Sequence, residues 1–289
     1  MTMDTDYLDH SVTITRDYGA VWQLYDRLGF TLSPPSRHRV TVTAGGPMVP
    51  SCTANRCAYF GESFIELIGI VDEQAPDPWR VLPLLERYEG LRGVSFGLGD
   101  SETALRRLRA ADLESGAGIT RLERPVDTPD GSRTMRARAV HLDRAKTPEG
   151  IVHAAEHLTP ELVHQPRYLD HPNGARRLDG VLLVVADDEL DGYVDRYAAI
   201  LARSATEDGP RRVFALRSGR MEIAPASALE ALLPGMTATA PPFFAAHAVA
   251  VDDLGAARRL VESGGIATRS APDGFFADAH GAAVVFREA

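Results

Sequence analysis

The stretch LDHSVTI at residues 8–14 decides the fold, because it reads as a β-strand that carries a histidine among apolar residues. Successive residues of a strand point to opposite faces, so His10 is predicted to share one face with Leu8 and Val12. Burying an unpaired polar group costs roughly 1–3 kcal/mol. We therefore expect His10 to have a partner on that face.

This strand opens a pattern that occurs four times along the chain. Each copy has a strand, an amphipathic helix and then further strands. The first strands lie at residues 8–14, 93–100, 178–188 and 243–253. One such unit leaves a sheet face uncovered, so two units are expected to pair. The pattern predicts an α+β protein of four βαβββ modules in two tandem pairs, each a curved eight-stranded mixed sheet with outer helices.

The boundary between the pairs is predicted from composition. A segment rich in Pro, Asn and Gly at residues 170–177 separates modules two and three. We therefore expect an N-terminal domain at residues 1–175 and a C-terminal domain at residues 176–289.

Composition restricts the class of partner. The chain has 289 residues, of which 44% are hydrophobic and 25% charged, as in soluble globular proteins. Its net charge of −9 disfavours nucleic acid and anionic membranes. Two cysteines, Cys52 and Cys57, are too few for a disulfide framework and fit a reducing compartment. We expect a cytoplasmic protein that binds a small molecule and could form a homodimer.

A second polar residue interrupts an apolar strand face. In SFIELIGI, residues 63–70, Glu66 shares a face with Phe64 and Ile68. A buried carboxylate and a buried imidazole are each unfavourable alone, and a shared divalent cation or a direct contact would stabilise both. Two interpretations remain open at this point: a metal site at His10 and Glu66, or a structural hydrogen-bonded pair.

These motifs resemble a known superfamily. The residues that carry the resemblance are LDHSVTI, RLGF (27–30), SFIELIGI, EGLRGVSFGLGD (89–100) and EHLTPELVHQPRYLDHPNGA (156–175). They are similar to vicinal oxygen chelate proteins, and within them to glyoxalase-like domain proteins. The resemblance implies the glyoxalase/bleomycin-resistance/dihydroxybiphenyl-dioxygenase fold. It also implies a divalent metal in the concave cleft, held by the first and last strands of a module, where His10 and Glu66 fall.

The second module offers fewer ligands than the resemblance implies. Gly93 stands at the position of His10. Glu156 and His157 are adjacent on the last strand, so only one can face the cleft. His157 would complete a set of two histidines and one carboxylate, whereas Glu156 would give a more oxygen-rich site. We favour His157, and the metal remains open among zinc, iron(II), manganese and nickel.

Modules three and four contain a less complete candidate for a second site. Glu222 and His247 fall at two ligand positions, but Gly180 and Val285 stand at the other two. The four-module length also resembles extradiol dioxygenases, whose iron lies in the C-terminal pair, and His247 alone matches that triad. We expect the C-terminal pair to serve packing or assembly.

A long segment rich in Pro and Gly at residues 32–55 is predicted to be a loop over the N-terminal cleft. His38 and Asn55 lie in this segment or at its end. They are second-tier candidates for contacts to a bound small molecule, and a solvated loop is the favoured interpretation.

The predicted function is that of a glyoxalase-like, metal-dependent enzyme. It would be a lyase or isomerase that acts on an oxygenated small molecule through an enolate-like intermediate, with Glu66 as general base. The alternative is a metal-free small-molecule binding or drug-sequestering protein of the same fold, with no cofactor. An extradiol-type dioxygenase is the less favoured third interpretation. The pair His10 and Glu66 favours the enzyme, and the missing ligands favour the binding protein.

Overall fold

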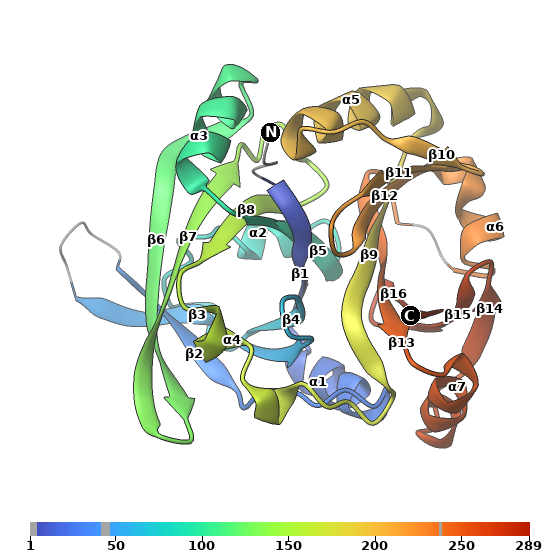
Figure 1. Cartoon of the computed structure of the whole chain (residues 1–289), viewed down its shortest axis with the longest axis horizontal. Helices are drawn as coiled ribbons and strands as arrows, with labels where there is room; N and C mark the ends of the chain where they lie inside the picture. Colours follow the sequence, from blue (N-terminus) through green and yellow to red (C-terminus); the bar gives the residue numbers. More distant parts are fainter. Residues whose placement is uncertain (1–4, 42–46, 237–238) are drawn as a thin grey trace.

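The computed structural model describes residues 5–41, 47–236 and 239–289. The sixteen strands in these ranges form two eight-stranded sheets, in the orders β2-β3-β4-β1-β5-β8-β7-β6 and β10-β11-β12-β9-β13-β16-β15-β14. The N-terminal half of the chain, blue to green in Figure 1, forms the first sheet, and the C-terminal half, yellow to red, forms the second.

Each sheet contains two βαβββ modules, as predicted. The first module contains β1 (Thr5–Thr15), α1 (Tyr18–Arg27), β2 (Ser36–Thr41), β3 (Met48–Tyr59) and β4 (Phe64–Ile70). The second contains β5 (Gly90–Leu98), α3 (Ser101–Ala110), β6 (Glu114–Thr128), β7 (Gly131–Leu142) and β8 (Ile151–His157). Strands β1 and β4 pair in parallel, and so do β5 and β8, whereas β1 and β5 are antiparallel, which makes the sheet mixed.

The C-terminal half repeats this order. The third module contains β9 (Ala175–Val185), α5 (Leu190–Leu201), β10 (Thr206–Asp208), β11 (Arg211–Ala215) and β12 (Arg220–Pro225). The fourth contains β13 (Phe243–Val251), α7 (Leu254–Ser263), β14 (Thr268–Ala271), β15 (Gly274–Asp278) and β16 (Ala283–Glu288). Short helices lie between the modules or at their ends: α2 (Leu82–Leu85), α4 (Pro160–Val163), α6 (Leu229–Leu232) and three 3-10 turns at Pro166–Tyr168, Asp187–Glu189 and Ala226–Ala228.

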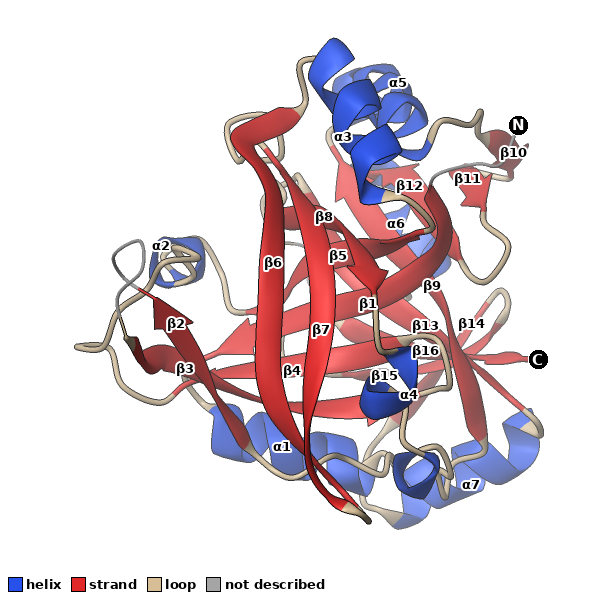
Figure 2. Ribbon diagram, turned by 60° about the vertical axis from the view of Figure 1, so that its left-hand side comes forward, coloured by secondary structure: helices blue, strands red, loops and turns tan. Residues whose placement is uncertain are grey.

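The two sheets and the long helices share one hydrophobic core. This core includes Leu8 and Phe96 from the first sheet and Leu178 and Phe244 from the second. Helices α1 and α7 lie at one end of the molecule and α3 and α5 at the other, as Figure 2 shows. We call the face of each sheet that is turned away from this shared core its inner face.

The first sheet curls strongly around its inner face. Phe64 of β4 packs in one apolar cluster with Met135 and Ala137 of β7, although three strands separate β4 from β7 in the sheet. Only a curved sheet brings such distant strands together. The inner face of the first sheet is therefore concave, as predicted.

The predicted loop at residues 32–55 is wrong over most of its length. Strands β2 and β3 occupy residues 36–41 and 48–59, and Val40 pairs with Val49 across them. The β-branched residues of this segment favour a strand, and the added pairing outweighs its prolines and glycines. The part of the predicted loop at residues 42–46 lies outside the described residues. Among the described helices, none has the length and apolar character needed to cross a membrane.

Candidate metal and active site

A β-bulge at Asp9 determines which side chains of β1 reach the inner face. Between Leu8 and His10, two residues of β1 occupy the place of one in the pairing with β5, so Asp9 is an extra residue. Leu8 consequently lies in the shared core, whereas His10 stacks on Phe64 of the inner-face cluster with ring centroids 4.3 Å apart. The prediction that Leu8 and His10 share a face is wrong, because the bulge interrupts the alternation.

Asp9 is fully buried and binds two imidazoles. Its Oδ2 accepts a hydrogen bond from His10 Nδ1 at 2.6 Å, and its Oδ1 accepts one from His157 Nε2 at 2.9 Å. Burial alone would raise the pKa of Asp9, but the charge and hydrogen bonds of His157 and His10 outweigh it and hold that pKa well below its usual range. Burial lowers the pKa of His157, and Asp9 more than compensates, so this pKa is raised. Asp9 is thus an ionised carboxylate with both oxygens occupied.

Glu66 faces the other nitrogen of His10. Its Oε2 lies 3.9 Å from His10 Nε2, and its Oε1 lies 3.6 Å from His38 Nε2. Asn55 donates a hydrogen bond to Oε1 at 2.6 Å. Burial raises the pKa of Glu66, but His38, His10 and Asn55 outweigh this effect and lower the pKa to about 2. The structure therefore brings His10 and Glu66 together on one face, with Glu66 ionised at neutral pH.

His38 and Asn55 reach this site from strands β2 and β3. The Nδ1 of His38 is hydrogen-bonded to Thr53 Oγ1 at 2.7 Å, which turns its Nε2 toward Glu66. Both residues were expected beside the cleft on a loop. They adjoin the site, but they do so as members of the sheet.

Strand β8 contributes a histidine that the sequence analysis missed. The ring of His153 lies 5.1 Å from that of His10 and 5.3 Å from that of His141, measured between centroids. Its Nδ1 is buried and has no hydrogen-bond partner among the described residues. Burial, with smaller effects of His10 and His141, holds the pKa of His153 well below its usual value, so its imidazole is neutral. The sequence did contain a signal for this histidine. His153 lies four residues before His157, so strand alternation places both side chains on the same face.

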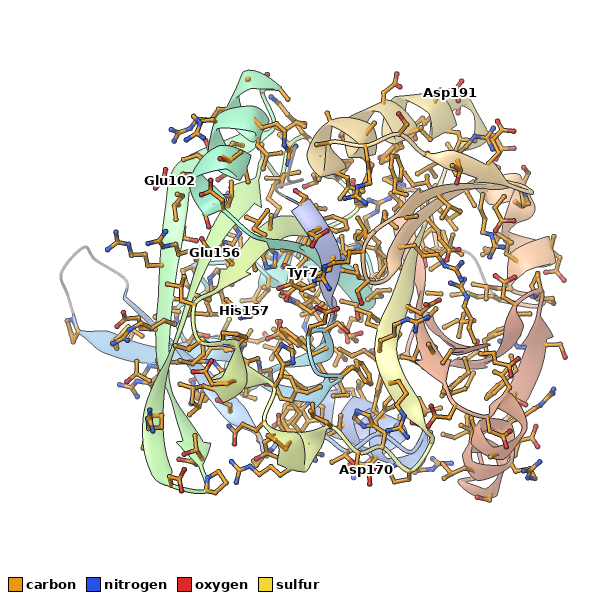
Figure 3. The ribbon with its side chains drawn as sticks, viewed as in Figure 1. Tyr7, Glu102, Glu156, His157, Asp170 and Asp191 are labelled. Atoms are coloured by element: carbon orange, nitrogen blue, oxygen red, sulfur yellow. The ribbon has the colours of Figure 1, made fainter. Side chains whose placement is uncertain are left out.

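The adjacent residues Glu156 and His157 point to opposite sides of β8, as Figure 3 shows. The carboxylate of Glu156 accepts a hydrogen bond from the hydroxyl of Ser101 at the start of α3. His157 points to the inner side, which is the alternative that the sequence analysis favoured. Its Nε2 is bound to Asp9, however, and so it has a different partner from the one expected.

The donor types on this face fit a divalent ion. His10, Glu66 and His153 provide two imidazoles and one carboxylate, a set that suits Fe(II), Mn(II) and Zn(II). No hydrogen bond within the described ranges involves His10 Nε2, and the buried Nδ1 of His153 likewise lacks a partner there. In those ranges no three His, Cys, Asp or Glu side chains are already placed to hold a metal ion. Binding would therefore have to draw these side chains closer together.

The inner face of the second sheet carries an ion-pair cluster instead. Glu222 is 1% exposed and forms ion pairs with Arg287 at 2.6 Å, with Arg220 at 3.0 Å and with Arg211 at 3.4 Å. The cavity beside it has a volume of about 20 Å³, which is room for a water molecule and not for a substrate.

The structure does not bring together the two second-site candidates, Glu222 and His247. Ala246 and Ala248 line the cavity beside Glu222, so His247 between them points to the opposite face. There it is hydrogen-bonded to Ser11 Oγ at 3.0 Å and to Tyr25 Oη at 2.9 Å. Sequence alternation could not establish this, because the orientation of His247 depends on the register of β13 against β9.

Comparison with solved structures agrees with this architecture. A hypothetical protein from Staphylococcus aureus is 11% identical, with a TM-score of 0.62 over 98% of this chain and 99% of that chain. A mutant of 4-hydroxymandelate synthase from Streptomyces coelicolor is 16% identical, with a TM-score of 0.59 over 93% of this chain and 78% of that chain. The Mn(II)-bound glyoxalase from Novosphingobium aromaticivorans is 10% identical, with a TM-score of 0.55 over 98% and 82%. At these identities the likeness shows the fold alone.

Comparison at the level of sequence identifies the family. A search of curated proteins finds no match. The sequence profile of the family described as a glyoxalase-like domain matches residues 8–201, which include both N-terminal modules and extend through α5. Because this match spans more than half of the chain, and because two sheets of paired βαβββ modules agree with it, the chain belongs to the glyoxalase-like domain family of the vicinal oxygen chelate superfamily.

Proposed function

We propose that the inner face of the first sheet is the active site of a divalent-metal-dependent enzyme of glyoxalase type. The observation that carries the proposal is the position of an ionised Glu66 on a concave face, 3.9 Å from His10 Nε2, which has no hydrogen bond to any described residue. His153 is the third proposed ligand, in place of His157, because its ring lies beside that of His10.

The bound ion would act as a Lewis acid toward adjacent oxygen atoms of the substrate. A carboxylate whose pKa is about 2 is a weak proton acceptor, so Glu66 suits the role of ligand better than that of general base. His38 lies beside Glu66, and Thr53 fixes its ring. We therefore assign proton transfer to His38, because its Nε2 faces the site and histidine is the side chain that most often transfers protons in enzymes.

The surroundings of the site favour a small substrate with an apolar part. One apolar cluster of the inner face includes Val12 and Ile68, and another includes Tyr59 and Phe64. Glu66 lies between Phe64 and Ile68 on β4 and so stands where the two clusters meet. An oxygenated group would bind at the polar centre while the clusters contact the rest of the molecule. Lyase or isomerase chemistry on an α-hydroxycarbonyl adduct or a phenolic ring meets this description.

Metal-free binding is the second candidate function. Glu66 already has partners in Asn55 and His38, and no set of three ligands is preformed in the described ranges. In that case the concave face would bind its small molecule without chemistry. An extradiol-type site in the second sheet has less support, because His247 points away from the inner face and Gly180 carries no donor.

Metal analysis of protein purified without chelators separates these functions. We expect about one equivalent of metal per chain by mass spectrometry, or one saturable site on titration with Zn(II), Mn(II), Fe(II) and Ni(II). His10→Ala and Glu66→Gln should lose this site. His280→Gln should retain it, because His280 lies in the second half of the chain and is 30% exposed. A wild-type protein that takes up none of these metals would favour metal-free binding.

A further inference from the structure

The bulge residue Asp9 is buried between the imidazoles of two different strands. It is 0% exposed, and its carboxylate oxygens lie 2.6 Å from His10 Nδ1 and 2.9 Å from His157 Nε2. We propose that Asp9 is a positioning residue that fixes His10 as the Nδ1–H tautomer, with Nε2 turned toward Glu66. The consequence for metal binding rests on the proposed function, whereas the tautomer does not.

The tautomer follows from what a carboxylate can do. An ionised carboxylate only accepts hydrogen bonds, so each imidazole nitrogen that faces Asp9 must carry a hydrogen. A neutral His10 then keeps its lone pair on Nε2, the atom 3.9 Å from Glu66. Free histidine in water prefers the opposite tautomer. Asp9 therefore selects the form of His10 that can bind a metal from the inner face.

The bulge makes this contact possible between neighbouring residues. In a regular strand Asp9 and His10 would point to opposite faces. The extra residue lets the carboxylate of Asp9 reach the ring next to it in the sequence. Phe64 stacks on the same ring with an interplanar angle of 20°. One hydrogen bond and one stacking contact thus restrict both the rotation and the tautomer of His10.

His157 is the second support of Asp9. Its Nε2 is bound to Asp9, and its Nδ1 is buried without a partner in the described part of the chain. A buried carboxylate with a single neutral partner is unfavourable, so the bond from His157 helps to keep Asp9 ionised. In this arrangement His157 acts on the site through Asp9, without facing Glu66 itself.

The second sheet provides a matched control. Asp179 is likewise an extra residue, because Leu178 and Gly180 of β9 pair with successive residues of β13. Its carboxylate binds Arg220 at 3.1 Å and Arg177 at 3.0 Å. Asp179→Asn therefore removes a charge from the equivalent bulge without touching His10.

The experiment is histidine ¹⁵N NMR of metal-free protein, with the His10 resonances assigned by their loss in His10→Ala. Wild-type His10 should be the Nδ1–H tautomer. Asp9→Asn should shift the equilibrium toward Nε2–H, and Asp179→Asn should not. Metal titration should then show an affinity about 10–100-fold lower for Asp9→Asn and an unchanged affinity for Asp179→Asn.

Two outcomes would overturn the proposal. An Nε2–H tautomer of His10 in the wild type overturns the proposal, even if Asp9→Asn does not fold. A folded Asp9→Asn with unchanged tautomer and unchanged metal affinity also overturns it. If the wild type binds no metal but His10 has the Nδ1–H tautomer and loses it in Asp9→Asn, the proposed function fails while the positioning by Asp9 stands.

Discussion

In the second sheet, the guanidinium of Arg287 lies where a side chain at Gly180 would be. Gly180 pairs with Arg220, and Arg220 precedes Glu222 by two residues. In the same way His10 pairs with Phe64, and Phe64 precedes Glu66 by two residues. A Cβ on Gly180 would lie 3.1 Å from Arg287 Nη1 and 3.0 Å from Glu222 Oε1. An internal cation of the protein thus binds the glutamate of this half, at the position corresponding to His10.

Removal of Arg287 should therefore destabilise the second sheet. Arg287→Met removes the hydrogen bonds of 2.6 and 3.2 Å from the buried Glu222, which keeps its ion pairs with Arg220 and Arg211, so we expect the free energy of unfolding to fall by about 1–3 kcal/mol. Urea denaturation measures the change. The double variant Arg287→Met/Glu222→Met is the control and should recover part of the loss, since it also removes the carboxylate that has lost its shortest ion pair. Equal loss in both variants would contradict this assignment.

His247 should contribute to stability and not to metal binding. His247→Ala leaves the buried hydroxyls of Ser11 and Tyr25 without this partner, and loss of a buried hydrogen-bond partner costs about 1–3 kcal/mol. Thermal unfolding and metal titration of the same variant test both halves of the statement. Tyr25→Phe is the milder control, because it removes one of the two bonds. Weaker metal uptake in His247→Ala would transfer the site to the second sheet.

The pH dependence of stability should also depend on His247. Burial lowers its pKa from 6.5 to about 3, so the folded state keeps this imidazole neutral while the unfolded state protonates near 6.5. The stabilising contribution is complete above pH 6.5 and is lost as the pH falls toward 3. The free energy of unfolding of His247→Gln should therefore fall less steeply than that of the wild type between these values. Parallel curves for the two proteins would refute the prediction.

The two inner-face histidines of β8 should differ in their effect on metal binding. His153→Ala removes a proposed ligand and should abolish stoichiometric binding. His157→Ala acts only through Asp9, so we expect a loss of affinity of about 10-fold. Isothermal titration of both variants with the same metal makes the comparison. A larger loss of metal affinity in His157→Ala than in His153→Ala would restore His157 as the ligand.

Local sequence patterns predicted the modules but not the details of the site. Alternation and helical spacing gave the order of the four βαβββ units, because each element buries one face. The positions of Leu8 and His247 were predicted wrongly for a common reason: strand alternation holds only when no extra residue intervenes and the register is known. His153 was missed because His157 already completed the expected set of three ligands, although strand alternation places His153 on the same face as His157.

The strands at residues 36–41 and 48–59 were also missed, since their pairing with the rest of the sheet stabilises a segment whose composition is that of a loop. Burial and long-range partners decide such cases, and a single sequence does not contain them directly.

The bulge at Asp9 recurs at Asp179, and this repetition has a consequence for protein engineering. The backbone of the second sheet already turns residue 180 toward Glu222. A histidine introduced at Gly180, combined with removal of the Arg287 side chain, would face Glu222 as His10 faces Glu66, with a small shift of the Glu222 carboxylate, whose Oε1 lies 3.0 Å from the added Cβ. The same repetition gives the two halves one backbone scaffold, in which His10 faces the glutamate of the first sheet and Arg287 faces that of the second.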